Sequence, residues 1–239
     1  NLTQTEDINP KSVGDWSAAL FSLSLNPFEL SATDVERVVS IANSTLMNAI
    51  DLEVTDISGL LGILKATDTA ASVQRQNYNP NDIETLSDDS GSSYRNNSAR
   101  GILTVATVFA DLMSRSQVLG ERATTYLYDN FRLSSQIHDF NSDSGGSSGI
   151  GGNISLFSPL TSAERYASIL PTTATLIPMG GSLTDTSLIT TKIISVHPQS
   201  YTPDTAAFWS NPFYVQLIPS DGKYISDVLK NIEFSFQHN

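Results

Sequence analysis

The sequence predicts an α+β fold: an N-terminal helical subdomain over residues 1–120, followed by an antiparallel β-sandwich over residues 121–239. Apolar residues recur at helical spacing in the first half. After Gly120 they fall in short runs rich in β-branched and aromatic residues. A block of helices followed by a block of strands is typical of chains with segregated α and β layers. At 239 residues and 39 % apolar composition, the chain is long enough to bury a substantial core.

The first helix is predicted within residues 14–25. Trp16, Leu20 and Leu23 lie at helical spacing there. Pro27 ends this helix, because the residue before a proline disfavours helical backbone.

A second helix is predicted to start behind Ser31, whose hydroxyl is suited to cap the first turn. Asp34 stands three residues later, where an acidic side chain makes an arrangement close to a capping box. The apolar stripe of this helix is expected to contain Val35, Val38, Ala42, Leu46 and Ile50.

A third and a fourth helix are predicted on either side of a polar segment. The third starts near Thr55 and Asp56, and the fourth is capped by Ser98 and ends before Gly120. Residues 77–97 are rich in Asp, Ser and Asn and are predicted to form an exposed acidic loop. The buried faces are expected to hold Ile57, Leu60, Leu61 and Leu64 in the third helix, and Ile102, Val105, Phe109, Leu112 and Met113 in the fourth.

Seven short strands are predicted in the second half. Turn-forming residues separate them, and a glycine- and serine-rich linker at 141–152 is expected to be a flexible loop. The expected strands cover residues 124–128, 131–137, 154–157, 173–177, 188–196, 213–218 and 232–236.

The last predicted strand has the clearest alternation. Ile232, Phe234 and Phe236 alternate with polar residues, which predicts one face on the sandwich core and one face in solvent. No further strand follows in this sequence. The outer edge of this strand is therefore expected to be paired with a strand from elsewhere or to be unusually exposed.

Composition excludes several classes of partner. The formal net charge is -12, and such an acidic chain repels phosphate backbones, so no nucleic-acid partner is expected. There is no cysteine, which excludes disulfides and thiolate metal sites within the chain. No run reaches the roughly 20 apolar residues that span a bilayer, so membrane attachment is expected only through a parent protein.

Four Asn-x-Ser/Thr sequences are candidate glycosylation acceptors, at Asn1, Asn43, Asn96 and Asn153. A chain so rich in Asn, Ser and Thr is expected to contain about this number by chance. The sequences therefore permit secretion without demonstrating it.

The three histidines are His138, His197 and His238. Each follows a predicted strand, and none has a histidine or acidic partner at the spacing of helical metal ligands. We therefore predict surface or strand-end histidines rather than a zinc site.

One segment resembles the start of a calcium loop, with Asp139, Asn141 and Asp143 at alternate positions. Ser144 replaces the glycine of that loop, and Ile150 stands where a bidentate glutamate is needed. A solvated turn is favoured over a calcium site, and no cofactor is expected.

The sequence does not predict an enzyme. It contains no nucleophile elbow, phosphate-binding loop or dinucleotide fingerprint. Its densest acidic group lies in the predicted acidic loop, where a solvated face is favoured over paired catalytic carboxylates. This group consists of Asp82, Glu84, Asp88 and Asp89.

An aromatic group surrounds Pro212 and contains Phe208, Trp209, Phe213 and Tyr214. Aromatic side chains dominate protein cores, so a turn packed on the sandwich is favoured over a carbohydrate platform. The platform nevertheless supports an alternative function, that of a carbohydrate- or protein-binding β-sandwich.

The order of these features resembles the GAIN domain, the autoproteolysis-inducing domain of adhesion receptors and polycystins. The resemblance rests on Met113 with Leu119–Glu121, on residues 124–133, on the glycine-rich approach to Pro159, on residues 193–196 and on residues 229–238. The entry into the sandwich, with Gly120-Glu121 and then Asn130-Phe131, is most similar to the polycystin branch. The resemblance implies a helical subdomain before a β-sandwich.

The sequence departs from that family in one respect. The family's cysteine- and tryptophan-containing proteolysis motif would follow the last strand, and this sequence ends before it. Self-cleavage needs His-Leu followed by Ser or Thr, whereas His138, His197 and His238 precede Asp, Pro and Asn. No catalytic residue is therefore carried over.

The resemblance implies an extracellular structural or adhesion module of a larger cell-surface or membrane-anchored, polycystin-like protein. Such a module presents neighbouring domains and transmits force. Its expected partners are other protein domains or chains, which would supply missing terminal strands by strand addition.

Overall fold

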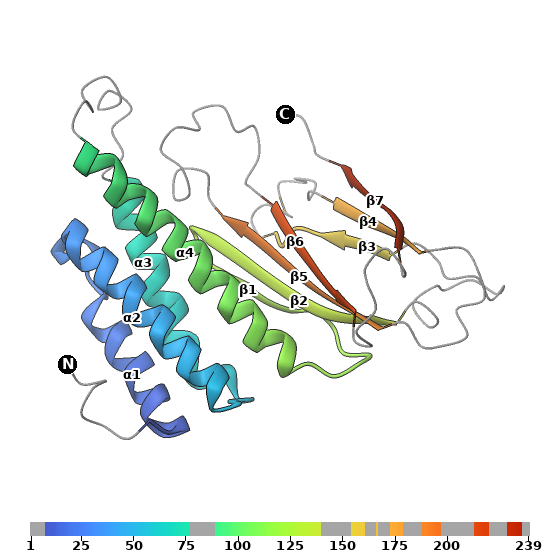
Figure 1. The fold of residues 1–239 in the computed structure, drawn as a ribbon, viewed down its shortest axis with the longest axis horizontal. Helices are drawn as coiled ribbons and strands as arrows, with labels where there is room; N and C mark the ends of the chain where they lie inside the picture. The colour runs from blue at the N-terminus through green and yellow to red at the C-terminus, as the bar shows by residue number, and fades with distance from the viewer. Residues whose placement is uncertain are drawn as a thin grey trace. The chain divides into compact units, whose positions relative to one another are not determined.

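Figure 1 shows the fold of the protein in a computed structural model, with helices α1–α4 in the N-terminal part and strands β1–β7 after them. The predicted α+β fold is confirmed. The structure describes residues 8–76, 89–139, 154–160, 166, 173–178, 188–196, 213–219 and 229–235.

The described residues form two compact units, which are considered separately. The helical unit contains residues 8–76, 89–116 and 128–131 together with Val196. The sandwich unit contains residues 117–127, 132–139, 154–160, 166, 173–178, 188–195, 213–219 and 229–235.

Helix α1 (Pro10–Leu23) begins four residues earlier than predicted. Asn9 caps it, because its side chain accepts hydrogen bonds from the backbone N–H groups of Lys11 and Ser12. Trp16 and Leu20 are buried, whereas Leu23, which shares their helical spacing, is 77 % exposed. Ser24 takes the buried position at this end, where its N–H bonds to the carbonyls of Leu20 and Phe21.

Helix α2 (Ala32–Asp51) begins as predicted. Ser31 and Asp34 form a capping box, in which each side chain accepts the backbone N–H of the other residue. Val35, Val38, Ala42 and Leu46 are buried, and Ile50 is half-buried. A one-turn helix, η2 (Pro27–Glu29), precedes α2.

Helix α3 (Leu61–Gln76) follows a short 3-10 helix, η3 (Ile57–Leu60), which Asp56 caps. Three of the four predicted core residues, Ile57, Leu60 and Leu64, are buried, and Leu61 is half-buried.

Helix α4 (Asp89–Arg115) starts well before the predicted cap at Ser98, so the loop predicted over residues 77–97 was wrong from Asp89 onward. A nucleated helix adds residues at low cost, one hydrogen bond each, and a polar extension leaves no apolar pattern to reveal it. The rest of the predicted loop lies outside the described residues. All five predicted core residues of α4 are fully buried: Ile102, Val105, Phe109, Leu112 and Met113.

Two glycines allow close helix packing in the helical unit. A Cβ atom at Gly62 of α3 would lie 2.5 Å from the carbonyl oxygen of Ser17 in α1. A Cβ at Gly101 of α4 would lie 2.4 Å from a methyl group of Val39 in α2. Helices α1 and α3, and α2 and α4, therefore approach each other at positions that have no side chain.

The seven described strands form two sheets, and every predicted strand is present at its predicted place with bounds shifted by three residues or fewer. The four-stranded sheet has the order β1 (Thr124–Leu127), β2 (Phe131–Asp139), β5 (Leu188–Val196), β6 (Phe213–Pro219). The three-stranded sheet has the order β3 (Ile154–Phe157), β4 (Thr173–Pro178), β7 (Leu229–Ser235).

The inner faces of the two sheets share one apolar core, as in a β-sandwich. Strands β3, β4, β5 and β6 contribute residues to it from their inner faces, and β7 packs Ile232 against it. The core cluster contains Leu156, Ala174, Leu176, Ile189, Ile193 and Leu217.

Strand β7 is the outer strand of the three-stranded sheet, and it pairs antiparallel with β4. Ile232, opposite Leu176 in the register, packs against the core cluster as predicted. Phe234 is opposite Ala174, and Phe236 lies outside the described residues. Within the described part of the chain, β7 pairs with β4 alone.

Candidate functional site

His138 lies near the end of β2, in line with the predicted strand-end position, but it is buried rather than at the surface. Strand β2 continues two residues beyond its predicted end, to Asp139, so His138 lies within the strand and is 6 % exposed. A hydrogen bond to Thr191 of β5 compensates its burial. His197 and His238 lie outside the described residues.

The proposed calcium ligands are described only in part. Asp139 ends β2, whereas Asn141 and Asp143 lie outside the described residues. The described residues contain no group of three or more acidic, histidine or cysteine side chains that could hold a metal ion.

Of the four candidate glycosylation acceptors, Asn43 is described most fully. It lies inside α2 and is half-buried, and its Oδ1 atom is inaccessible to solvent. Asn96 lies in α4, and Asn1 and Asn153 lie outside the described residues. The helical backbone at Asn43 is thus a poor place for a glycan.

The acidic and aromatic groups are also only partly described. Asp89 is the first residue of α4, and Phe213 and Tyr214 begin β6, where Tyr214 is half-buried. Outside the described residues lie Asp82, Glu84, Asp88, Phe208 and Trp209.

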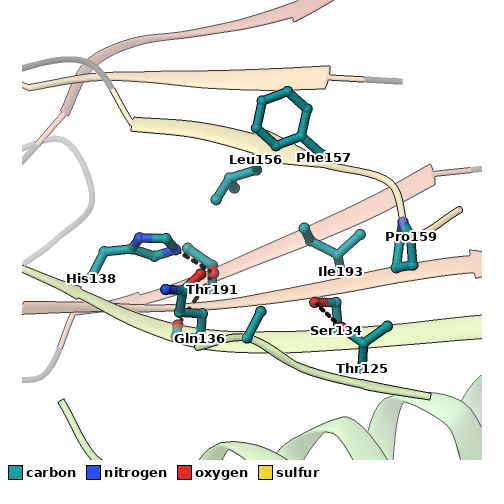
Figure 2. Close-up of a pocket in the computed structure, with 10 residues that line it drawn as sticks. Thr125, Ser134, Gln136, His138, Leu156, Phe157, Pro159, Thr191 and Ile193 are labelled. Atoms are coloured by element: carbon teal, nitrogen blue, oxygen red, sulfur yellow. Dashed lines mark hydrogen bonds between the residues drawn. The ribbon is translucent and has the colours of Figure 1, made fainter. Parts of the chain in front are cut away.

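A cavity of ≈ 190 Å³, here called the sandwich cavity, lies between the sheets of the sandwich unit (Figure 2). One side is formed by β1, β2 and β5, and the other by β3 and the residues just after it. The cavity is lined by Ala123, Thr125, Ser134, Gln136, His138, Leu156, Phe157, Pro159, Thr191 and Ile193.

Strand β2 places a row of polar residues along this cavity. Ser134, Gln136 and His138 stand at alternate positions, so they share one face of the strand at intervals of about 6.7 Å. Burial of polar groups on the inner face of a sandwich is costly unless each finds hydrogen-bond partners. This row was not predicted to line a site.

A hydrogen-bond chain fixes the His138 end of the row (Figure 2). The Thr191 hydroxyl donates to the backbone carbonyl of Gln136 at 3.2 Å, and it lies 3.1 Å from Nε2 of His138. Because the hydroxyl has one proton, Nε2–H of His138 donates to Thr191. A nucleophilic hydroxyl would need the reverse arrangement, giving its proton to the imidazole. In this arrangement the bond joins β2 to β5.

The other end of the row is fixed by contacts between neighbouring strands. The hydroxyls of Ser134 and Thr125 lie 3.3 Å apart, at paired positions of β2 and β1. Arg132, also on β2, donates from its guanidinium to the carbonyl of Pro159 at 3.0 Å. This bond holds the segment after β3 against the four-stranded sheet.

The opposite side of the cavity is apolar. In Figure 2 the Leu156 side chain points from β3 toward Thr191 and Gln136, whereas the Phe157 ring points away. Leu156 is buried, and Phe157 is 55 % exposed. Among the described residues that line the cavity, none is Asp, Glu, Lys or Arg.

A second buried polar cluster lies in the helical unit. The backbone N–H of Asn130 donates to Oδ1 of Asp68 at 2.9 Å. The side-chain amide of Asn130 donates to Asp68 and, at 2.7 Å, to the hydroxyl of Ser72. Asn130 is fully buried. Burial raises the pKa of Asp68 above its ordinary value, although the hydrogen bonds from Asn130 oppose the shift.

Comparison with models of known protein families finds no match, and comparison with curated proteins finds none at a significant level. The GAIN-domain resemblance therefore remains a prediction based on the residues quoted for it. In the described part of the chain, no helix combines the length and the apolar character needed to cross a membrane.

Proposed function

We propose that this chain is an extracellular structural or adhesion module of a larger, polycystin-like cell-surface protein. It presents neighbouring domains and transmits force through its β-sandwich. The proposal rests on the order of the sequence features, and the helical unit followed by a sandwich supports it. Its partners are other protein domains or chains.

The observation that carries the proposal is the position of β7. This strand is held on one side by its ladder with β4, and Ile232 anchors it in the sandwich core. Its other side pairs with no strand in the described residues. Extracting β7 would break the ladder and expose Ile232 to water, so the strand resists force. A strand at the edge of the described sheet suits strand addition by a partner.

A disulfide across the β4–β7 ladder tests the mechanical part of the proposal. The chain has no cysteine, so Thr175→Cys with Glu233→Cys creates a single pair at register partners. Their Cα atoms lie about 4.5–5.5 Å apart in an antiparallel ladder, within disulfide range. We expect oxidation to raise the force needed to extend the full chain when it is pulled from its C-terminus in optical tweezers.

The matched control pairs Ser155→Cys with Thr175→Cys, which ties β3 to β4 and leaves β7 free. This pair is expected to leave the first extension force unchanged. If the 175–233 disulfide has no more effect than the control, β7 is not the force-bearing strand.

Sedimentation of the full chain tests whether β7 accepts a strand from another chain. Strand addition at the outer side of β7 is expected to support self-association that rises with protein concentration, and a lysine in this strand, Glu233→Lys, should reduce it. A chain that stays monomeric at all concentrations would count against strand addition at β7.

A further inference from the structure

We infer that the sandwich cavity binds a neutral, ring-sized ligand bearing several hydroxyl groups, of the kind represented by a single pyranose sugar. No described lining residue of the cavity belongs to β7, so the site is distinct from the β7 edge. It would add a recognition function to the structural role proposed above.

The size of the cavity limits its occupant to about one ring. Its volume is ≈ 190 Å³. An apolar cavity of about 150 Å³ accommodates one benzene ring, whereas sites for drug-sized ligands are about 300–1,000 Å³. A single six-membered ring with its substituents therefore fits, and a longer ligand must extend out of the cavity.

The lining requires that the occupant be neutral. None of the described lining residues is Asp, Glu, Lys or Arg, and the nearby guanidinium of Arg132 is engaged with the carbonyl of Pro159. A charged ligand would lose its hydration without an ionic partner, which costs far more than burying a hydroxyl. This excludes phosphates, carboxylates and amines as the preferred class.

The two sides of the cavity match the two kinds of surface on a sugar ring. The polar side offers hydroxyl groups from Thr125 and Ser134, the Gln136 amide and the His138–Thr191 pair. The apolar side offers Leu156 and Pro159, and Ile193 of β5 adds an apolar surface to the polar side (Figure 2). A pyranose presents hydroxyls at its rim and C–H groups on its faces, so it satisfies both sides at once.

The polar side keeps hydrogen-bonding capacity for a ligand. Ser134 and Thr125 share one hydrogen bond, which uses one of their two hydroxyl protons. The second proton and the unused lone pairs of both oxygens can bond to hydroxyls in the cavity. A ligand lacking hydroxyls would leave these groups unsatisfied, which gives the site its selectivity.

The site is also held in shape before any ligand binds. The Arg132–Pro159 bond fixes the segment after β3, and the His138–Thr191 bond joins β2 to β5. Both bonds limit the conformational entropy that binding would cost.

Titration of the full chain with methyl glycosides of common hexoses tests the inference. Isothermal titration calorimetry or ligand-observed NMR measures the binding. We expect saturable binding of at least one methyl glycoside. Cyclohexanol, a ring of similar size with one hydroxyl, and glucuronate, a ring with a carboxylate, are expected to bind more weakly. Absence of saturable binding by every glycoside overturns the inference, as does preferential binding of glucuronate.

Two variants locate the binding. Ser134→Ala and Thr125→Val each remove one hydroxyl from the cavity, and each is expected to weaken binding about five- to tenfold. Ser22→Ala on the exposed face of α1 is the control and should leave the affinity unchanged. Circular dichroism confirms folding, and the two cavity variants lie on different strands so that the result does not depend on either alone. Affinity that neither variant reduces would place the ligand elsewhere.

Discussion

Asp68 is the residue whose environment most clearly couples folding to pH. Burial raises the pKa of its carboxyl group, and the charge of Asp129 acts in the same direction. Folding therefore favours protonated Asp68. Its contribution to stability is fully present below the ordinary pKa of 3.8 and is lost as the pH rises through the raised value.

Relative to the native protein, Asp68→Asn is expected to raise the free energy of unfolding. This gain should grow as the pH rises from below 3.8 to neutral. Asparagine stays neutral at every pH, and its carbonyl can still accept the N–H of Asn130. Urea unfolding at a series of pH values measures the difference in free energy of unfolding. If the difference in free energy of unfolding between variant and native protein stays constant or shrinks with rising pH, desolvation of Asp68 does not control the pH dependence of stability.

Asp56→Asn provides a control with the opposite sign. Asp56 caps η3, and the hydrogen bonds from Ser58 lower the pKa of its carboxyl group. Its stabilising contribution is present above the ordinary pKa and is lost as the pH falls through the lowered value. The loss of stability in this variant should therefore be larger at neutral pH than at low pH.

Single residues were the hardest features to predict from the sequence. The alternation of Ser134, Gln136 and His138 was visible, but a polar face of a strand normally indicates solvent. This face lies inside the sandwich because β2 pairs with β1 and β5. Its hydrogen-bond partners, Thr125 and Thr191, come from those two strands. The Asp68–Asn130 cluster likewise joins residues 62 positions apart, and no local pattern reveals it.

At the level of elements, the close approach of α1 and α3 depends on Gly62. A Cβ atom at this position would meet backbone atoms of Ser17, which cannot rotate away. Gly62→Ala is therefore expected to lower the free energy of unfolding by about 1–3 kcal/mol, as overpacked cores do. Thermal or urea unfolding of the full chain measures this change.

Gly14→Ala is the matched control, because apart from the nearby backbone of α1 itself no atom lies within 4 Å of the Cβ that would be added there. Alanine is the better helix former, so this variant is expected to gain about 0.5–1 kcal/mol. Equal effects of the two substitutions would show that helix propensity, rather than the contact with Ser17, determines the outcome at Gly62.

Elements with a marked composition or period were predictable, and most strand ends were predicted to within three residues. Ser31 and Asp34 indicated the start of α2, and short β-branched and aromatic runs bounded by turn residues located all seven strands. The start of α4 had no such signal, because the helix extends through polar residues from Asp89. The exposure of Leu23 also depends on tertiary packing, since its spacing alone places it on the buried face.

For the whole molecule, the sequence predicted the order of helices and strands but not the pairing of strands. Strand β3 lies between β2 and β4 in the chain, yet it pairs with β4 and belongs to a different sheet from β2. Such assignments depend on contacts distant in sequence, such as those among Leu156, Leu176 and Ile193 in the sandwich core. Strands of both sheets line the cavity. The sequence of the strands in one sheet alone therefore could not predict it.

The net charge of -12 predicts how the stability of the whole chain responds to salt. Like charges repel more strongly in the compact state, and salt screens this repulsion over a Debye length of about 10 Å at 0.1 M. The ion pairs Lys11–Asp15 and Arg37–Asp34 are exposed, so screening them costs little. Sodium chloride is therefore expected to raise the Tm at pH 7. The rise should be about 2–4 °C for each 1 kcal/mol gained in the free energy of unfolding.

Near pH 4.4, the sequence isoelectric point, the net charge approaches zero and the same salt should change the Tm little. Calorimetry of the full chain at both pH values, with potassium chloride as a second salt, separates screening from effects of a particular ion. Sucrose, which is uncharged, should raise the Tm at both pH values, because its exclusion from the protein surface does not depend on charge. A Tm that falls with salt at pH 7 would mean that specific attractive pairs outweigh the general repulsion.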